Sequence, residues 1–258
     1  MTGLVRVFSL FLIILIAVGG AAALQPTEDV VLGIPANPPL TQLDERGVSG
    51  LIAETTVLVL RRMGHSIVPR KLPFARMYKW VHNGKLDVAT SVLRTEKRAQ
   101  MARYTNPIIS EYTVVAVPKG KAFPMGSVDD LKHKRIGAII GFSYPGVEGK
   151  GIMLIRETNY EKNLIKVAKG RLDGALISSI AGIHLAKVLG LQDQIEYLPV
   201  AVDAVPLGSA LSKKVFSADD LERFNVLVRK LKSSEEWQKI LTRNDAMDLV
   251  KTWPLLTE

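Results

Sequence analysis

One short pattern occurs twice in this sequence and constrains the fold more than any other feature. Residues 83–89 read NGKLDVA, and residues 169–175 read KGRLDGA. In each copy a stretch of helical spacing ends at the glycine, and an apolar run suited to a covered strand follows the aspartate. Such a junction is common in α/β proteins, so one copy alone would say little. Two copies predict two α/β lobes of similar build.

The first copy indicates where a ligand would lie. Apolar residues at positions 74, 77, 78 and 81 share one face of a helix that begins after Pro73, and residues 87–92 follow as a strand. At the end of that strand and just beyond it come Ser91, Arg94 and Arg98. In an open α/β sheet, ligands bind in the crevice beyond the carboxyl ends of the strands. Two arginines at that edge favour an anionic ligand.

Several segments together carry a resemblance to a known family. The run GKLDVATSVLRTEKR at 84–98, followed by YTNP at 104–107, resembles the signature of family 3 of the bacterial periplasmic solute-binding proteins, the polar amino-acid receptors of ABC transporters. Residues 38–40 match the family's proline loop, 141–143 its second-lobe ligand turn and 170–178 its second-lobe strand. The resemblance covers essentially the whole chain past its apolar N-terminus. It implies a two-lobed α/β fold, the type II periplasmic binding protein, with two hinge crossings and a ligand cleft between the lobes.

The resemblance also implies roles for individual side chains. Arg98 matches the family's carboxylate-binding arginine, whose planar guanidinium pairs bidentately with a carboxylate. Phe74 falls where the family places an aromatic ring against the ligand, although a plain core role stays open. Ser143 matches the serine or threonine of the second-lobe turn. The chain is one residue shorter than the common form between Asp87 and Thr95, which puts Leu93 or Arg94 in place of a hydroxyl residue. If Arg94 points into the cleft, the ligand carries extra negative charge.

The sequence departs from the family pattern at Ser178. Amino-acid receptors of this family usually have an aspartate five residues after the aspartate of the second-lobe strand, where it pairs with the ligand's α-ammonium group. Counting from Asp173 reaches Ser178. A serine can accept a hydrogen bond but cannot neutralise a buried cation. We therefore expect Ser143 and Ser178 to close on the ligand from the second lobe, and the ligand to be either an amino acid or a carboxylate without the amine.

The first residues have the order of a secretory signal peptide. Arg6 precedes an apolar run at 7–18 and small residues at 21–23, and we expect cleavage after Ala23. The alternative is a membrane anchor, but the run is shorter than the ~20 residues that a spanning helix needs. The chain contains no cysteine for a lipid anchor. We expect residues 1–23 to direct export to the periplasm and the mature protein not to be embedded in the membrane.

The remaining chain is expected to form two lobes joined by two crossings. We assign residues 24–117 and 205–258 to lobe 1 and residues 118–204 to lobe 2. The first crossing is expected at 118–120, where a strand rich in β-branched residues runs into Pro-Lys-Gly, and the return at 205–211. A chain that leaves one lobe and returns to it has two linkers, the usual basis of hinge closure.

Composition and motifs argue against several function classes. The formal net charge is +9, but the lysines and arginines are scattered and form no basic stripe interleaved with aromatic residues, so we do not expect nucleic-acid binding. The four histidines lack metal-ligand spacing, and no phosphate-binding or dinucleotide fingerprint is present, so we expect no metal and no cofactor. We expect a monomer whose partners are a small anionic ligand and an ABC permease.

Two alternative functions stay open beside the receptor. The segment 141–146, GFSYPG, is one residue too long for a G-x-S-x-G nucleophile elbow, and His184 is the only histidine downstream of Ser143, so a serine hydrolase is the less favoured of the two. The other is a ligand-sensing or accessory periplasmic protein without its own permease. Our interpretation is a binding protein and not an enzyme.

Overall fold

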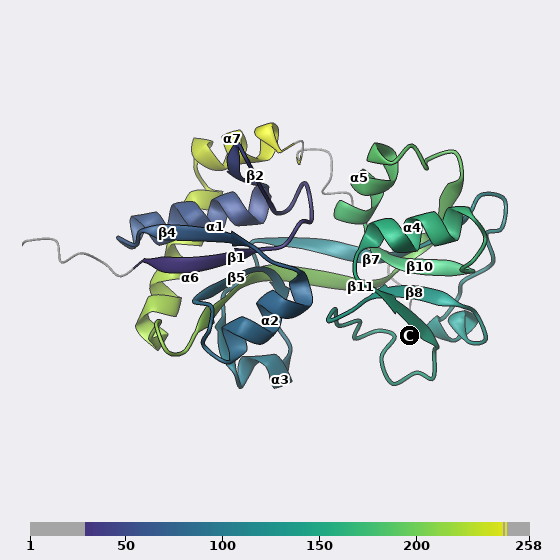
Figure 1. Ribbon diagram of the computed structural model, residues 1–258, viewed down its shortest axis with the longest axis horizontal. Coiled ribbons are helices and arrows are strands. Elements are labelled where there is room, and N and C mark those ends of the chain that lie inside the picture. The colour runs from purple at the N-terminus through teal and green to yellow at the C-terminus, as the bar shows by residue number, and fades with distance from the viewer. Residues whose placement is uncertain (1–28, 245, 247–258) are drawn as a thin grey trace, which may run out of the picture.

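The computed structural model describes residues 29–244 and residue 246, which form two lobes connected by two long strands (Figure 1). The signal peptide expected at residues 1–23 lies outside the described residues. The strands are β1 Val30–Ile34, β2 Gln42–Asp44, β3 Gly47–Ser49, β4 Ile67–Lys71, β5 Val88–Leu93, β6 Ala102–Tyr104, β7 Ile109–Pro118, β8 Ile136–Ile139, β9 Leu154–Glu157, β10 Gly174–Ser178 and β11 Ile195–Ser212. The helices are α1 Leu51–Arg62, α2 Phe74–His82, α3 Glu96–Ala99, α4 Tyr160–Ala168, α5 Ala181–Val188, α6 Ala218–Lys232 and α7 Glu235–Arg243, with a 3-10 helix at Val128–Leu131.

A single mixed sheet of nine strands runs through both lobes. Its order is β4-β1-β5-β11-β7-β10-β8-β9, and β6 also pairs with β11. The first three strands of this order run parallel in lobe 1, and the last three run parallel in lobe 2. Parallel strands are normally covered on both faces. In lobe 1, α1 lies on one side of β1 and β5 and α2 lies on the other (Figure 1).

Both copies of the repeated pattern form the predicted junction between a helix and a strand. α2 ends before Gly84 and leads into β5, and α4 ends before Gly170 and leads into β10. Both glycines have positive φ, 68° and 65°, a conformation that a side chain disfavours. Asp87 and Asp173 each accept a backbone N–H from the adjacent strand segment, at 2.8 and 2.7 Å. The repeated aspartates therefore fasten each junction to its neighbour in the sheet.

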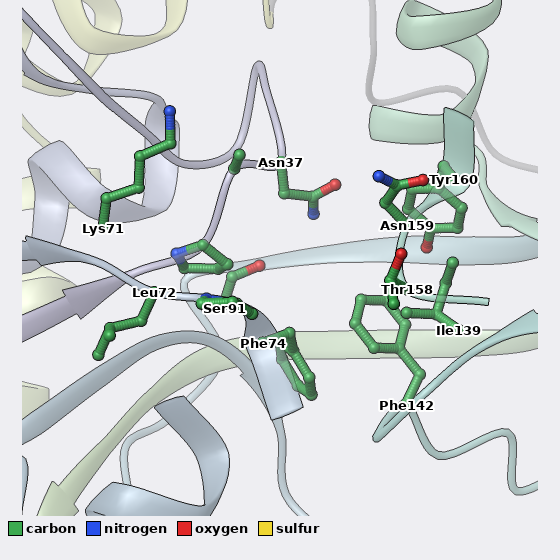
Figure 2. A pocket seen from close by; sticks show the side chains of 13 residues that line it. Asn37, Lys71, Leu72, Phe74, Ser91, Ile139, Phe142, Thr158, Asn159 and Tyr160 are labelled. Atoms are coloured by element: carbon green, nitrogen blue, oxygen red, sulfur yellow. The ribbon is translucent and has the colours of Figure 1, made fainter. Parts of the chain in front are cut away.

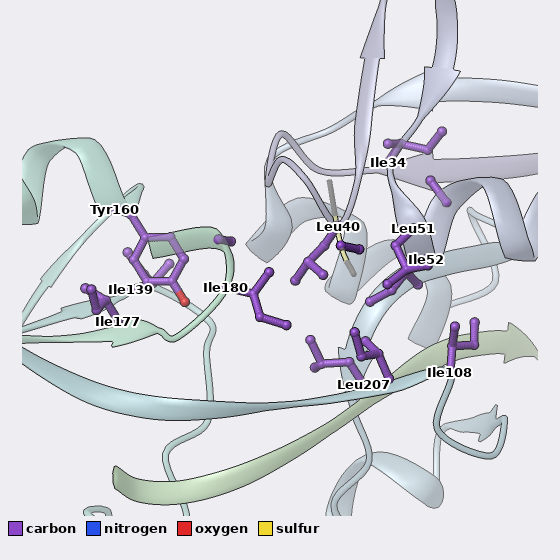
Figure 3. Packing of buried hydrophobic residues seen from close by; sticks show 14 of the residues in the cluster. Ile34, Leu40, Leu51, Ile52, Ile108, Ile139, Tyr160, Ile177, Ile180 and Leu207 are labelled. Atoms are coloured by element: carbon purple, nitrogen blue, oxygen red, sulfur yellow. The ribbon is translucent and has the colours of Figure 1, made fainter. Parts of the chain in front are cut away.

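The largest apolar cluster continues from one lobe into the other. Leu40 belongs to its lobe 1 part and Ile177 to its lobe 2 part, and Ile180, just before α5, lies between the two groups (Figure 3). A second cluster covers the opposite face of the lobe 1 sheet, where Met77 and Val81 of α2 are almost fully buried. These two residues confirm the predicted apolar face of the helix.

β7 pairs with strands of both lobes, so the first passage between them runs along this strand. Residues 113–116 of β7 pair with β10 of lobe 2, whereas Ile109 pairs with Leu207 beside lobe 1. The turn at 118–120, where we expected the crossing, follows the far end of β7 in lobe 2. The return also lies inside a strand, because β11 is continuous through both lobes (Figure 1). Both crossings are therefore extended, paired backbone.

Candidate functional site

Two adjoining cavities lie between the lobes. The larger has a volume of about 360 Å³ and is lined by both lobes. Figure 2 shows Asn37 and Phe74 of lobe 1 opposite Phe142 and Tyr160 of lobe 2 across it. The smaller cavity borders β7 and β11 and shares these four residues and Ser91 with the larger one. The two cavities therefore form one cleft with walls from both lobes.

Ser91 reaches the cleft because β5 is irregular at this point. In the register with β11, Val92 pairs with Gly208 and Thr90 with Ser209, which leaves Ser91 unpaired as a bulge. Its φ is 57°, in the left-handed region that non-glycine residues rarely adopt, and the residue is only 6% exposed. A bulge redirects a side chain and often lies beside a binding site. The structure thus brings the predicted Ser91 to both cavities.

Arg98 is held at the cleft wall by the short helix α3. Thr95 begins this helix by accepting the backbone N–H of Arg98 at 3.3 Å. The guanidinium donates to the carbonyl of Leu93 at 3.1 Å and, across the cleft, to the carbonyl of Gly141 at 2.9 Å. Arg98 is only 6% exposed, and none of the ion pairs among the described residues includes it. It is a buried cation without an acidic partner in this part of the chain.

The turn at 141–142 of lobe 2 rests directly on the start of α2. The rings of Phe74 and Phe142 meet edge to face, with their centroids 4.4 Å apart. Gly141 has a φ of 84°, and a Cβ added there would lie 3.3 Å from the Cα of Ala75. Together with the hydrogen bond from Arg98, these contacts join the two lobes. Phe74 therefore lines both cavities while packing against an aromatic ring of the other lobe.

An aromatic group supports Arg98 on its lobe 1 side. The guanidinium carbon lies 4.5 Å from the ring centroid of Tyr78, within the range of a cation–π contact. Tyr78 in turn meets the ring of His82, which hydrogen-bonds the Tyr104 hydroxyl at 2.8 Å. Burial and the charge of Arg98 lower the pKa of His82 to about 4, so this histidine is neutral at pH 7. The predicted arginine thus lies on an aromatic ring, next to a histidine that is neutral at pH 7.

Two other cations lie near the cleft, and only one of them lines it. Arg94 is exposed and borders neither cavity, so the structure does not bring it together with Arg98. Lys71, at the end of β4, lines the larger cavity (Figure 2). The sequence reasoning missed Lys71 because it followed only the first helix-to-strand junction. The position of Lys71 at the carboxyl end of a parallel strand was the signal for it.

Ser143 lines the smaller cavity, and its hydroxyl donates to Glu148 at 3.0 Å. Glu148 also pairs with Arg156 at 3.2 Å. His184 lines a different cavity, beside the β2–β3 hairpin, together with Arg243. A serine nucleophile needs a base within hydrogen-bond reach, and the described residues give Ser143 no histidine partner. The geometry therefore offers nothing for the hydrolase alternative.

Ser178 lines the smaller cavity but has no free hydrogen-bonding capacity. Its Oγ accepts the N–H groups of Ile180 at 3.1 Å and Ala181 at 2.8 Å, and its hydroxyl donates to the carboxyl of Glu111. A serine hydroxyl has one donor and two acceptor sites, so all three are used. Ser178 thus orients Glu111, and it is Glu111 that adds an ionisable group to this wall.

Glu111 is a second cleft residue that the sequence reasoning missed. It lies in β7, lines the smaller cavity and is 5% exposed. Burial raises the pKa of its carboxyl from 4.5 to about 7, although the hydrogen bond from Ser178 acts in the opposite direction. The strand expected before residues 118–120 was identified from its β-branched residues, and this acid was not considered as a cleft residue. A glutamate inside the β-branched run was the available signal.

Among the described residues, no group of three His, Asp or Glu side chains could hold a metal ion. None of the helices in the same part of the chain has the length and apolar character needed to cross a membrane.

Two lobes around a shared cleft, with a buried guanidinium in its wall and paired strands as linkers, define a two-lobed ligand-binding protein. More specifically, the chain belongs to the bacterial extracellular solute-binding proteins, family 3, whose profile matches residues 30–244. This match confirms the family resemblance noted in the sequence. A search of curated proteins found no match.

Solved structures of similar fold agree with this assignment. An ancestral arginine-binding protein bound to arginine has a TM-score of 0.70 and 19% identity, covering 85% of this chain and 99% of that chain. A histidine kinase sensor domain with similarity to periplasmic binding proteins has a TM-score of 0.74 and 20% identity, with coverages of 85% and 96%. Holo ArgBP from T. maritima has a TM-score of 0.69 and 21% identity, with coverages of 83% and 95%. At these identities the likeness establishes the two-lobed α/β fold.

Proposed function

We propose that this protein is a periplasmic receptor that captures a small carboxylate-bearing molecule, an amino acid or a related organic acid, for an ABC-type importer. The observation that carries the proposal is that Arg98 is buried and lacks an acidic partner among the described residues. Its guanidinium is buried at the cleft, and its hydrogen bonds go to the neutral carbonyls of Leu93 and Gly141. A carboxylate would give this cation both a counter-charge and two parallel hydrogen bonds.

The other predicted residues support different parts of a bound ligand. Ser91 and Ser143 offer hydroxyl groups from opposite lobes. Phe74 and Phe142 give the cleft apolar, aromatic walls suited to a hydrophobic or planar portion. Ser178 acts through its hydrogen bond to the neighbouring carboxyl in this proposal. Arg94 contributes only to the surface charge around the cleft, because it borders neither cavity.

Strand pairing supports lobe boundaries that differ slightly from those expected from the sequence. We propose that lobe 1 ends near residue 111 and resumes near residue 205, since these two positions pair with each other between the regions bonded to β10 and to β5. The Arg98–Gly141 hydrogen bond joins the lobes. A ligand that contacts both lobes adds to this closed population, which a permease would recognise.

A ligand-sensing or accessory role is the alternative, and it uses the same cleft. A permease and an ATPase encoded beside the gene, with ATPase activity that rises when the liganded protein is added, would favour import over sensing. The family is described as extracellular, and this description supports the predicted periplasmic location. A monomer is part of the proposal, and light scattering of the purified protein measures its mass.

The test is a thermal-shift screen of the protein expressed from the full sequence. The probes are amino acids, dicarboxylates, keto acids, aromatic acids and polyamines. A ligand at 100 times its Kd stabilises the fold by about 2.7 kcal/mol, which corresponds to a rise in Tm of roughly 5–10 °C for a protein of this size. The variants are Arg98→Ala and, as a matched control from the same short helix, Lys97→Ala, whose side chain is exposed.

We expect at least one carboxylate to raise the Tm of the wild type and of Lys97→Ala but not of Arg98→Ala. A response to polyamines alone, or an unchanged response of Arg98→Ala, would refute the proposed function. The Tm of Arg98→Ala without probe shows whether the variant is folded, because a folded variant melts cooperatively.

A further inference from the structure

The smaller cavity contains a buried acid that forms no ion pair with the described residues. Glu111 is 5% exposed, and its carboxyl receives a hydrogen bond from Ser178. None of the ion pairs formed by the described residues includes Glu111. Leaving a carboxylate buried without a counter-charge is costly, so its protein surroundings favour the neutral acid. The Glu111 carboxyl is therefore suited to pair with a cationic group that a ligand supplies.

The other described ionisable side chains that line this cavity are one arginine and two tyrosines. Arg98 lies in the lobe 1 wall, and it does not form an ion pair with Glu111. Tyr144 and Tyr160 contribute hydroxyl groups from lobe 2, and burial raises the pKa of both above the ordinary value, so they are neutral. Among the described lining residues, the cavity therefore has one positive side chain and one acid that can become negative.

The position of Glu111 connects it to lobe closure. It pairs in the sheet with Val205, where β7 and β11 pass between the lobes, and both residues line the cavity. The hydroxyl of Ser178 in lobe 2 fixes the carboxyl through its donated hydrogen bond. A carboxylate has about four acceptor sites, so Glu111 keeps acceptor capacity after this bond is made.

We propose that Glu111 is the negative pole of the ligand site and selects carboxylates that also carry a cationic nitrogen. This proposal rests on the function proposed above, in which Arg98 receives the ligand's carboxylate. The cationic group of the ligand takes the place of a proton on Glu111, and that proton passes to the solvent. The acid thus supplies, from β7, the counter-charge that Ser178 cannot supply from β10.

Binding of such a ligand should release protons in a pH-dependent amount. With a pKa of about 7 in the free protein, Glu111 is about 90% protonated at pH 6 and about 10% protonated at pH 8. A ligand with a cationic nitrogen then releases about 0.9 proton at pH 6 and about 0.1 at pH 8. A ligand with only a carboxylate releases none from this group, because it offers no cation to take the place of the proton.

The experiment compares pairs of probes that differ only in the amine. Suitable pairs are L-phenylalanine with 3-phenylpropanoate, L-glutamine with glutaramate, and L-leucine with 4-methylpentanoate, since the second member of each pair has no cationic nitrogen. Titration calorimetry on the full-length protein at pH 6 and pH 8, each in two buffers of different ionisation enthalpy, gives the affinity and the number of protons released. The variants are Glu111→Gln and the control Glu161→Gln, which makes the same change in the exposed first turn of α4.

We expect the amine-bearing member of at least one pair to bind at least about 30-fold more tightly, as is typical when one partner of a buried charge pair is removed. Glu111→Gln should abolish this preference and the proton release at pH 6, and Glu161→Gln should retain both. If the desamino probes bind as tightly as the amines, or if Glu111→Gln keeps the preference, the inference fails and the carboxylate receptor stands. If no carboxylate probe binds, the proposed function fails and the inference fails with it.

Discussion

Replacing Glu111 by glutamine should change how the stability of the ligand-free protein depends on pH. The pKa of this carboxyl is 4.5 in the unfolded reference and about 7 in the folded protein, where burial disfavours the charge. A raised pKa means that the folded state holds a proton that the unfolded state has lost, so the free energy of unfolding falls as pH rises from 4.5 to 7. At 1.36 kcal/mol per pH unit, the loss is about 3 kcal/mol.

Urea titrations of the wild type, Glu111→Gln and the control Glu161→Gln between pH 4.5 and pH 8 would measure this effect. The glutamine cannot ionise, so the stability of Glu111→Gln relative to wild type should rise by about 3 kcal/mol across this range and level off above pH 7. Glu161→Gln should follow the wild type in parallel. A difference between wild type and Glu111→Gln that stays constant with pH would refute the assigned burial of this acid.

Three other substitutions test the cleft. Gly141→Ala should destabilise the fold by about 1–3 kcal/mol, because φ is 84° and the new Cβ would press on Ala75; an unchanged urea midpoint would contradict the lobe contact. Arg94→Ala should change the affinity for a bound carboxylate by less than about twofold, since screened surface charges contribute little. A tenfold loss of affinity in calorimetry would show that Arg94 contacts the ligand. Ser178→Ala should cost about 1–3 kcal/mol and raise the pKa of Glu111 further, which a carboxyl infrared titration would detect as a higher midpoint.

The lobes could be predicted from the sequence because their junctions are local. Gly84 and Gly170 stop a helix through backbone conformation, and the aspartates that follow bond to an adjacent strand. These effects act within a few residues, so the pattern can be recognised from the sequence alone. The place of Arg98 near the sheet edge was local in the same way, because it lies in the short helix that follows its strand, whereas its role came from the family resemblance.

The crossings could not be located in this way. β11 continues through residues 195–212, whereas the return between the lobes was expected at 205–211. Its bulges near Ala201 and its pairing with both β7 and β5 are tertiary features, and the prolines at 199 and 206 look like strand breaks in the sequence alone. The same holds for β9, which follows a run with glycines at 146, 149 and 151 and was not predicted from the sequence.

The polar side chains of the cleft were only partly predictable, because their roles depend on partners distant in the sequence. Ser178 was expected to contact a ligand, but its hydroxyl is used by Glu111 and by the start of α5. Arg94 and Arg98 both follow the same strand, and only the turn into α3 decides that one is exposed and the other buried. Spacing gives the edge of the sheet where a residue lies but not the direction of its side chain.

The pairing of β7 with β11 limits how the lobes can move. Two independent coil linkers would allow one lobe to swivel or slide relative to the other. Here the linkers are adjacent strands of one hydrogen-bonded ladder, with Val205 opposite Glu111 at the passage between the lobes. Shear or independent rotation would break ladder bonds, whereas bending normal to the sheet retains them. Opening of the cleft should therefore bend this two-stranded ribbon in one direction, normal to the sheet. The hydrogen bonds between the two strands should restore its shape when the cleft closes.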